Sequence, residues 1–294
     1  MARKPDWRIV TDSRDKLGES PQWNGATGEL YWVDLFGPTI RRLSPDGSRK
    51  DWKVPGFATI GAIVRCADGR LLCGFDSGLH FFDPRSGAVT FFADPNEARP
   101  ELVYNDAKVD RHGNFWVGNY DATESAPRGI LYSLNRQGKW SIGDSGFTVC
   151  NGPSFSPQGD VLYFNDSAGR QTLAYDLDGA TGKLSNRRVF QKYAETDGMP
   201  DGCCVDSKGC VWVAMYDGGK LFRLSPQGER LLTLSVPARN PTSCCFGGKD
   251  LRTLFVTSAE APDGSDPQGG ALFAADVDVP GLPEPEFHPP AAAA

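Results

Sequence analysis

Short apolar runs separated by polar turns recur along the whole chain, and they follow the spacing of strands. Runs such as those at 30–34 (LYWVD) and 161–166 (VLYFND) are bounded by Gly, Asp, Asn and Pro. Apolar and aromatic runs of about four to eight residues between such turn signals predict β-strands. No 15-residue window sustains the i, i+3, i+4, i+7 apolar spacing of an amphipathic helix. The pattern therefore predicts an all-β fold.

The strand runs stack into six copies of one unit. Each copy has a short strand, a turn that ends in Gly, a strongly aromatic strand and a further strand. The first residues of successive copies are 42, 44, 46, 50 and 41 residues apart. These first residues are Glu19, Gly61, Asn105, Asn151, Asp201 and Thr242. A period of about 40–50 residues is that of a four-stranded blade, so the sequence predicts a six-bladed β-propeller.

The two ends of the chain complete this prediction. Residues 6–11 (DWRIVT) precede the first unit and are expected to add a strand to the last blade, which closes the ring and removes its free edges. We expect a single propeller domain over residues 1–282. Residues 283–294 are rich in Pro and Ala and are expected to form a peripheral or disordered tail. A two-sheet sandwich is the alternative, but its strands would need no repeat.

The composition suits many short strands and limits the expected partners. The 294 residues include 34 Gly and 22 Pro, as tight turns require. The net charge is −6 and no basic cluster occurs, so nucleic acid is not an expected partner. No stretch approaches the roughly 20 apolar residues of a membrane span, and residues 1–12 lack the apolar core of a secretory signal. We therefore expect a cytoplasmic protein with no membrane partner.

Several polar and aromatic residues have structural interpretations. Eight cysteines lie mostly in apolar runs without a CxxC pair, and they are expected to be reduced core residues. Asp34 and Asp166 end their strands, and a role as turn acceptors is favoured over a second polar layer in the channel. Three tryptophans share one phase of the aromatic strand and are expected to pack between blades. They are Trp32, Trp116 and Trp212.

Polar residues stand at the head of four of the six units, at one phase of the repeat. In a propeller the innermost strands line the central channel, so residues at one phase converge at one mouth. Two carboxylates and two amides would supply the oxygen ligands of one divalent cation: calcium, magnesium, manganese, zinc or iron(II). The four residues are Glu19, Asn105, Asn151 and Asp201.

An ordinary turn is the competing interpretation of these heads, because Asn-Gly and Asp-Gly are common turn dipeptides. The recurrence of four polar heads at one phase weighs against it. Glu19 weighs most, since Glu-Ser-Pro is not a preferred turn and Glu is a poor strand residue.

Five ordered motifs carry a resemblance that extends over nearly the whole chain. They read LGESPQW…GELYWVD, NDAKVDRHGNFWVG, NGPSFSPQGDVLYFNDS, PDGCCVDSKGCVWVA and PTSCCFGGKDLRTLFVTSA. On these motifs the chain resembles the SMP-30/gluconolactonase/luciferin-regenerating-enzyme family, also called regucalcin-like proteins. The resemblance implies a six-bladed propeller that holds one divalent cation near its axis. It also implies an enzyme, since family members of known activity mostly open sugar lactones.

The resemblance assigns roles to the polar heads. Carried over by motif, the metal ligands are Glu19, Asn151 and Asp201, and Asp201 doubles as the catalytic acid and base. Asn105 matches the Asn with which the family contacts its substrate.

The substrate side of the pocket departs from the family pattern. Sugar lactonases of the family often carry Arg two residues before the substrate-contacting Asn, in an R-x-N-D-G run, where this chain has Val103. An acidic residue of the family that contacts substrate aligns closest to Thr123, with Asp121 and Glu124 beside it. These four positions are therefore expected to bind substrate, and a preference for sugar lactones is in question.

These features leave three functions open. The leading one is a metal-dependent hydrolase that opens a lactone ring, for which no Ser-His-Asp set is needed; no G-x-S-x-G run occurs. A hydrolase of another ester, a thiolactone or a phosphotriester on the same metal is the second. A calcium-binding regulator or propeller scaffold without activity is the third, although the chain lacks the WD40 signature. A small-molecule lactone or ester is the expected partner, and the oligomeric state is left open.

Overall fold

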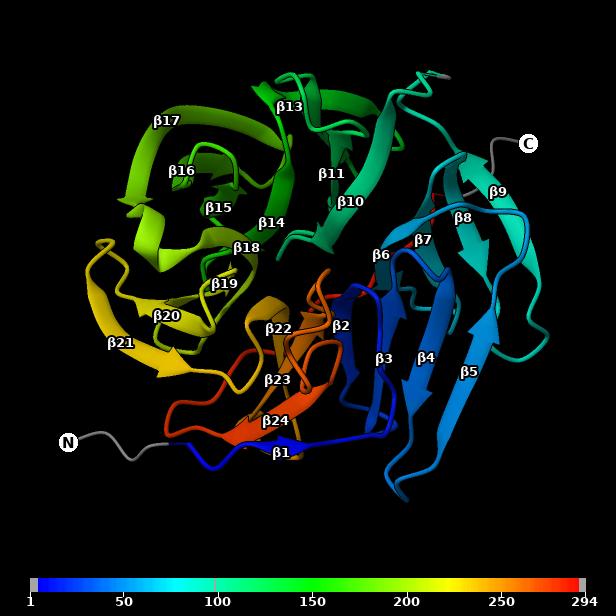
Figure 1. Ribbon diagram of the computed structural model, residues 1–294. Helices are drawn as coiled ribbons and strands as arrows, with labels where there is room; N and C mark the ends of the chain where they lie inside the picture. Colours follow the sequence, from blue (N-terminus) through cyan, green and yellow to red (C-terminus); the bar gives the residue numbers. More distant parts are fainter. Residues whose placement is uncertain (1–4, 98, 291–294) are drawn as a thin grey trace.

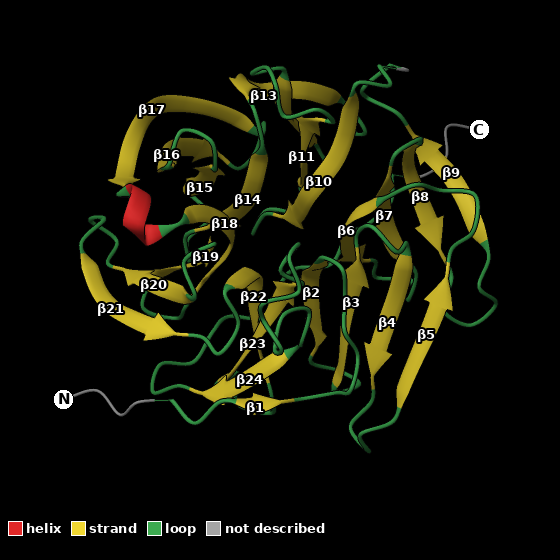
Figure 2. Cartoon of the chain, viewed as in Figure 1, coloured by secondary structure: helices red, strands yellow, loops and turns green. Residues whose placement is uncertain are grey.

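Six four-stranded antiparallel sheets stand in a ring around a central axis. This arrangement is seen in a computed structural model, which describes residues 5–97 and 99–290 (Figure 1). Within those ranges the only helical element is a single 3-10 turn, Glu195–Asp197, drawn red in Figure 2. None of the described helices is long and apolar enough to cross a membrane. The predicted six-bladed β-propeller is confirmed.

Each blade is numbered along the chain, and its strands follow from the axis outward. Blade 1 contains β2 (Gly18–Asn24), β3 (Glu29–Asp34), β4 (Thr39–Leu43) and β5 (Arg49–Lys53). Blade 2 contains β6 (Ile60–Arg65), β7 (Leu71–Phe75), β8 (Gly78–Phe82) and β9 (Val89–Ala93). Blade 3 contains β10 (Leu102–Val109), β11 (Phe115–Asp121), β12 (Gly129–Leu134) and β13 (Trp140–Phe147).

The second half of the ring repeats this order. Blade 4 contains β14 (Cys150–Phe155), β15 (Val161–Asp166), β16 (Gln171–Asp178) and β17 (Lys183–Lys192). Blade 5 contains β18 (Met199–Val205), β19 (Val211–Tyr216), β20 (Lys220–Leu224) and β21 (Arg230–Ser235). Blade 6 contains β22 (Asn240–Gly247), β23 (Thr253–Ala259), β24 (Phe273–Asp276) and, outermost, β1 (Arg8–Ile9).

The N-terminal segment closes the ring as predicted. β1 pairs antiparallel with β24, with Arg8 opposite Ala274. The indole of Trp7 donates a hydrogen bond of 2.7 Å to the Ser235 carbonyl of blade 5. The last blade therefore combines strands from both ends of the propeller sequence. Because β1 pairs with β24, the outer edge of β24 is not left unpaired.

Buried tryptophans of the second strands fill the spaces between blades. Trp32, Trp116 and Trp212 are at most 2% exposed. Each indole N–H donates to a buried carboxylate, at 2.9, 3.0 and 3.0 Å. The acceptors are Asp15, Asp110 and Asp206. The interpretation of these rings as packing residues is confirmed, and a buried indole with a partner costs little to desolvate.

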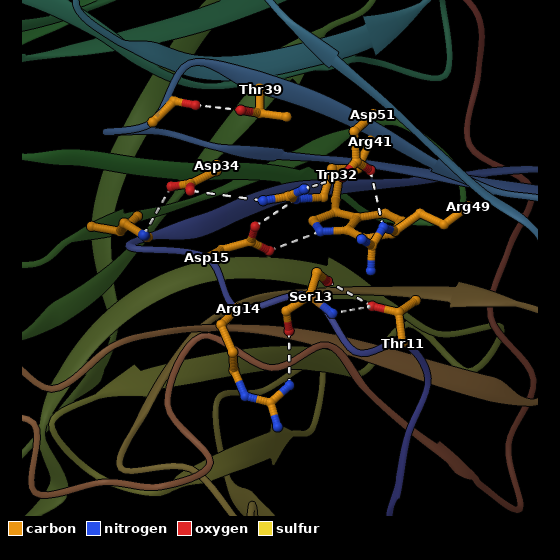
Figure 3. Close-up of polar contacts among 12 residues, drawn as sticks. Thr11, Ser13, Arg14, Asp15, Trp32, Asp34, Thr39, Arg41, Arg49 and Asp51 are labelled. Carbon is orange, nitrogen blue, oxygen red and sulfur yellow. Dashed lines mark hydrogen bonds and ion pairs between the residues drawn. The ribbon is translucent and has the colours of Figure 1, made fainter.

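Figure 3 shows this cluster in blade 1, where ion pairs reinforce it. Asp15 accepts from both Trp32 and Arg41, whose Nε lies 2.6 Å from Oδ1. Asp34 accepts from the Leu17 backbone N–H at 3.2 Å, and in blade 4 Asp166 accepts from a turn N–H at 3.1 Å. Asp166 is therefore a turn acceptor, as predicted, whereas Asp34 holds the backbone just before β2 rather than a turn.

All eight cysteines are free thiols in buried positions, as expected. Cys204 and Cys244, on the inner strands of neighbouring blades, bring their sulfur atoms to 3.4 Å. Thiols this small allow the inner strands to approach closely near the axis.

After β24, residues 280–287 cross the channel; we call this segment the C-terminal strap. Its first residue accepts a hydrogen bond from Ser207 of blade 5, and its last, Phe287, forms a parallel bridge with Cys66 of blade 2. Blades 5 and 2 stand on opposite sides of the ring, so the strap spans the end of the channel where the inner strands finish. Phe287 is 2% exposed.

The strap differs from the peripheral or disordered tail expected over residues 283–294. Phe287 packs in the core between blades 2 and 3, with ring centroids 5.4 Å from Phe115 and 5.9 Å from Phe92. The packing of the propeller therefore extends past residue 282. Residues 291–294 of that prediction lie outside the described part of the chain.

Candidate active site

A β-bulge interrupts every inner strand at its head. The pairing register of each inner strand with its neighbour shifts at this point, and a bulge bends the strand and redirects side chains. The shifts lie at Glu19/Gln22, Ile60/Ala62, Tyr104/Ala107, Asn151/Ser154, Pro200/Cys203 and Pro241/Cys244. The first residues of the six sequence units thus lie at or next to a bulge that recurs in every inner strand.

The four polar heads meet at one mouth of the channel. Glu19, Asn105, Asn151 and Asp201 line a single cavity of about 320 Å³. Blade 2 contributes no side chain here, because a Cβ on Gly61 would lie 2.0 Å from the Tyr104 carbonyl oxygen. The predicted convergence is therefore observed for blades 1, 3, 4 and 5.

A chain of hydrogen bonds fixes the two amides. Asn105 Nδ2 donates to Asn151 Oδ1 at 2.6 Å and to the Cys150 carbonyl at 2.9 Å. Asn151 Nδ2 donates to Ser167 Oγ at 2.8 Å, and that hydroxyl donates to the Pro200 carbonyl at 2.6 Å. Asn151 is therefore oriented from both ends, with one lone pair of Oδ1 left for a further partner.

Three buried carboxylates belong to the same inner strands as these amides or to the inner strands of other blades. Glu19, Asp106 and Asp201 are 3%, 7% and 8% exposed. Burial raises the pKa of Glu19 well above its usual value, and the charges of Asp201 and Asp106 raise it further. Burial also raises the pKa of Asp201, and the Asp106 charge adds to it. Like charges held together in this way favour protonation of at least one member.

Asp106 is a member of this set that the sequence reasoning missed. Burial raises its pKa to about 6, against the lowering effects of the Gly152 N–H, 2.9 Å from Oδ2, and of Lys108. The bulge at Tyr104/Ala107 places Asp106 beside Asn105. The only signal in the sequence was its adjacency to a polar head, and a regular strand would have turned it away.

The donor set fits a hard divalent cation. Two carboxylates and an amide oxygen, with Asp106 alongside, match the oxygen ligands of such ions, and a bound cation would relieve the repulsion among the acids. Among the described residues no group of three or more His, Cys, Asp or Glu side chains forms a metal cage by itself. The site would therefore depend on the Asn151 amide and keep positions open for water and substrate.

The structure divides the residues expected to bind substrate. Glu124 lines the cavity, with its backbone at φ 51°. Asp121 is fully buried and accepts from the Thr123 N–H and hydroxyl at 3.0 and 2.7 Å. Asp121 and Thr123 thus shape the turn that presents Glu124, and neither is part of the cavity lining. Val103 is 8% exposed and stands opposite Tyr120, which lines the cavity.

Comparison with known proteins agrees with this geometry. The sequence profile of the SMP-30/gluconolactonase/LRE-like region matches residues 17–260. A 6-deoxy-6-sulfogluconolactonase of Pseudomonas putida is 32% identical over 287 residues, covering 95% of this chain and 98% of the relative. A regucalcin of Xenopus laevis is 33% identical over 277 residues, covering 90% and 92%. A solved calcium-binding protein, regucalcin, of Agrobacterium tumefaciens has a TM-score of 0.90 at 25% identity and 98% coverage of both chains.

Proposed function

The chain belongs to the SMP-30/gluconolactonase/LRE-like family, and on that premise we propose that it is a metal-dependent hydrolase that opens a lactone ring. One observation carries the proposal. Glu19 and Asp201 are buried at an open mouth of the channel beside an oriented amide, and the charge of buried Asp106 acts on both. Among the described residues, the cavity lining holds no cationic side chain. The relatives that bear lactonase names support the reaction class.

The proposed metal ligands are Glu19, Asn151 and Asp201. A divalent cation held there would polarise the lactone carbonyl and stabilise the charge that develops on its oxygen. Its identity among calcium, magnesium, manganese, zinc and iron(II) is left open by an all-oxygen donor set. Asn105, whose Nδ2 is already engaged, would meet the substrate with its Oδ1.

Asp201 is the proposed acid and base. It would take a proton from water as the water oxygen bonds to the carbonyl carbon, and return that proton to the ring oxygen as the ester C–O bond breaks. Its backbone carbonyl accepts a hydrogen bond from Asn165 Nδ2, and Asn165 Oδ1 accepts from Thr172 Oγ1 at 2.6 Å. These contacts hold the bulge of β18, and with it the carboxylate.

The test is a titrimetric assay of ring opening, made on the metal-stripped protein and again after each of the five cations is restored. We expect turnover of lactones only with metal, and a tenfold or greater excess over thiolactones and phosphotriesters. Faster turnover of a thiolactone or phosphotriester would favour the other hydrolase. Tight calcium binding without turnover of any ester would instead make the chain a binding protein.

A further inference from the structure

An apolar layer covers the polar heads on the side of the opening. The residue two positions before each head is apolar. Three of the four line the cavity, and the fourth, Val103, stands opposite a lining tyrosine. The layer consists of Leu17, Val103, Val149 and Met199. Val103 is therefore one of several apolar residues at or beside the cavity rather than an isolated replacement of Arg. We call these four residues the apolar wall.

Aromatic partners extend this wall across the strands. Tyr120 stands opposite Val103 in blade 3, and Tyr216 stands opposite Met199 in blade 5. Both rings line the cavity, as does Phe36 of blade 1, whose side chain is 53% exposed. A large exposed apolar side chain at the rim of a pocket is typical of a surface that receives a ligand.

The charges of the cavity are all negative. Among the described residues its lining holds no Lys, Arg or His, and its ionisable acids are Glu19, Glu124 and Asp201. The charge of Asp106, which is not in the lining, also acts on Glu19 and Asp201, and Lys108 offsets part of it. One divalent cation would balance two of these charges and leave the cavity negative. An anionic substituent would therefore be repelled, and it would find no arginine to bind it.

Only part of the polar lining of the cavity is left for sugar hydroxyls. Apart from Glu19 and Asp201, the polar side chains left in the lining are Asn105, Tyr120, Glu124, Thr148 and Tyr216. The Ser167 hydroxyl is engaged as donor and acceptor, and both ends of the Asn151 amide have partners. A hydroxyl buried without a partner loses its hydrogen bonds to water, which disfavours binding. The side chains of the wall are mostly apolar, so contact with a hydrocarbon group of the substrate would remove apolar surface from water and favour binding.

We propose that the substrate is an uncharged lactone with an apolar substituent, which packs against Leu17, Val149 and Met199 while the ring carbonyl faces the polar heads; Val103 supports this surface behind Tyr120. This inference rests on the proposed function. A sulfonate such as the name of the Pseudomonas putida relative describes would meet acids and no basic side chain among the described residues of the lining.

The decisive comparison uses two six-membered lactones with the same number of non-hydrogen atoms. δ-Decalactone carries an alkyl chain, whereas D-glucono-1,5-lactone carries hydroxyls. With the metal-loaded protein we expect kcat/KM at least about tenfold higher for δ-decalactone, since even one methylene in an apolar pocket is worth about tenfold or more. The anionic 6-phospho-D-glucono-1,5-lactone should be the poorest of the three.

Two variants locate the preference in the wall. Met199→Gln keeps the length of the side chain but adds a polar end, and should lower the ratio of decalactone to gluconolactone kcat/KM about tenfold. Val103→Arg should lower the same ratio by improving gluconolactone. Leu231→Gln, at an exposed apolar residue of β21 away from the cavity, is the matched control and should leave the ratio unchanged.

The outcomes separate the two proposals. Equal or better turnover of gluconolactone, or of its phosphate, would overturn the apolar substrate and leave the lactonase standing. An unchanged ratio in both Met199→Gln and Val103→Arg would also overturn it. Metal binding without turnover of any of the three lactones would overturn the lactonase itself, and the inference with it.

Discussion

Both ends of the central channel contain charged side chains away from solvent, but one end brings like charges together and the other pairs opposite charges. At the mouth where the inner strands begin, Glu19, Asp106 and Asp201 are buried within the influence of one another's charges, and the pKa of each is raised, chiefly by burial. At the end where the strands finish, opposite charges are paired. Arg65 lies 2.6 Å from Glu286 of the C-terminal strap, on an Nη1–Oε1 contact.

Lys108 joins the two ends. Its Nζ donates to the Cys203 carbonyl at 2.7 Å and lies 3.9 Å from Glu284 of the strap. Its charge also lowers the pKa of Asp106 on the other side, although burial outweighs it. The strap therefore completes the charge pairing of one end, while one lysine cannot balance three acids at the other.

The comparison shows that burial of charge does not by itself mark a functional site. Paired charges at the strap end are satisfied within the chain and need no ligand. Like charges at the open mouth are satisfied only by protons or by a cation from outside. Substitutions of the like charges at the open mouth and of the paired residues at the strap end should therefore have different consequences.

Asp201→Asn tests the open mouth. The substitution keeps an oxygen ligand and the volume but removes the base, so kcat at saturating metal should fall about 10²–10⁴-fold. Asp217→Asn, at an exposed acid paired with Arg239, is the matched control and should keep normal turnover. Near-normal kcat in Asp201→Asn with metal bound would mean that another group carries the proton, with Asp106 and Glu124 as the next candidates.

Phe287→Ala tests the strap end. Loss of a buried Phe removes contacts with Phe92 and Phe115, and should lower the free energy of unfolding by about 3–5 kcal/mol in denaturant titrations. Metal affinity and kcat of the folded protein should stay close to wild type. A loss of turnover with unchanged stability would contradict the structural role of this end.

One substitution made at both ends should have opposite effects. Without metal, Glu19→Gln relieves repulsion and should raise Tm, whereas Glu284→Gln removes the partner of Lys108 and should lower it. Each shift should be about 2–4 °C, since roughly 1 kcal/mol moves Tm by that amount in larger domains. Calorimetry of the two variants measures the signs directly.

Metal affinity separates the same two variants. Glu19→Gln should weaken cation binding by at least about tenfold, the effect of even an outer partner of a metal ligand. Glu284→Gln should leave it unchanged. Equal signs in Tm, or equal losses of affinity, would remove the distinction between the two ends.

The pH dependence of stability follows from the raised pKa values. The carboxyls of the open mouth bind protons more tightly in the folded state than in the unfolded state. Their contribution is complete below the unfolded pKa near 4 and is lost as pH rises through about 6, the folded pKa of Asp106, and beyond. The Tm of the metal-free protein should therefore fall between pH 5 and 8.

With metal the same pH change should have the opposite consequence. Binding requires ionised carboxylates, so the cation should bind more tightly at pH 8 than at pH 5. The Tm difference between loaded and metal-free protein should grow accordingly. A metal-free Tm that stays level or rises from pH 5 to 8 would contradict the raised pKa values.

Site residues that recur at one position of the repeat could be predicted from the sequence, whereas a site residue placed by a β-bulge could not. Glu19, Asn151 and Asp201 were found because each occupies the same phase of its blade. Asp106 was missed because a bulge places it beside Asn105, and the alternation of a regular strand would turn it away. Bulge positions depend on how two strands pair, which one strand's sequence does not display.

The packing of the C-terminal strap and the position of Glu124 in the cavity were also not predicted, because both depend on contacts made only in the folded chain. The Pro and Ala content of residues 283–294 predicted a loose tail, yet Phe287 packs in a core formed by blades 2 and 3, which are far away in sequence. Near the cavity, Thr123 was the closest match to the family's acidic residue, with Asp121 and Glu124 as its neighbours. A turn with Glu124 at φ 51° decides among them, and that conformation is set by the folded context.

The central claim is that the acids of the open mouth hold one cation. A crystal grown with Mn²⁺ and measured for anomalous scattering tests it most directly, because the ion itself is located. We expect one strong peak at the mouth, with side-chain oxygens of Glu19, Asn151 and Asp201 about 2.0–2.6 Å away, and no peak at the strap end. A peak elsewhere, or none at the mouth in a crystal at saturating Mn²⁺, would contradict the account.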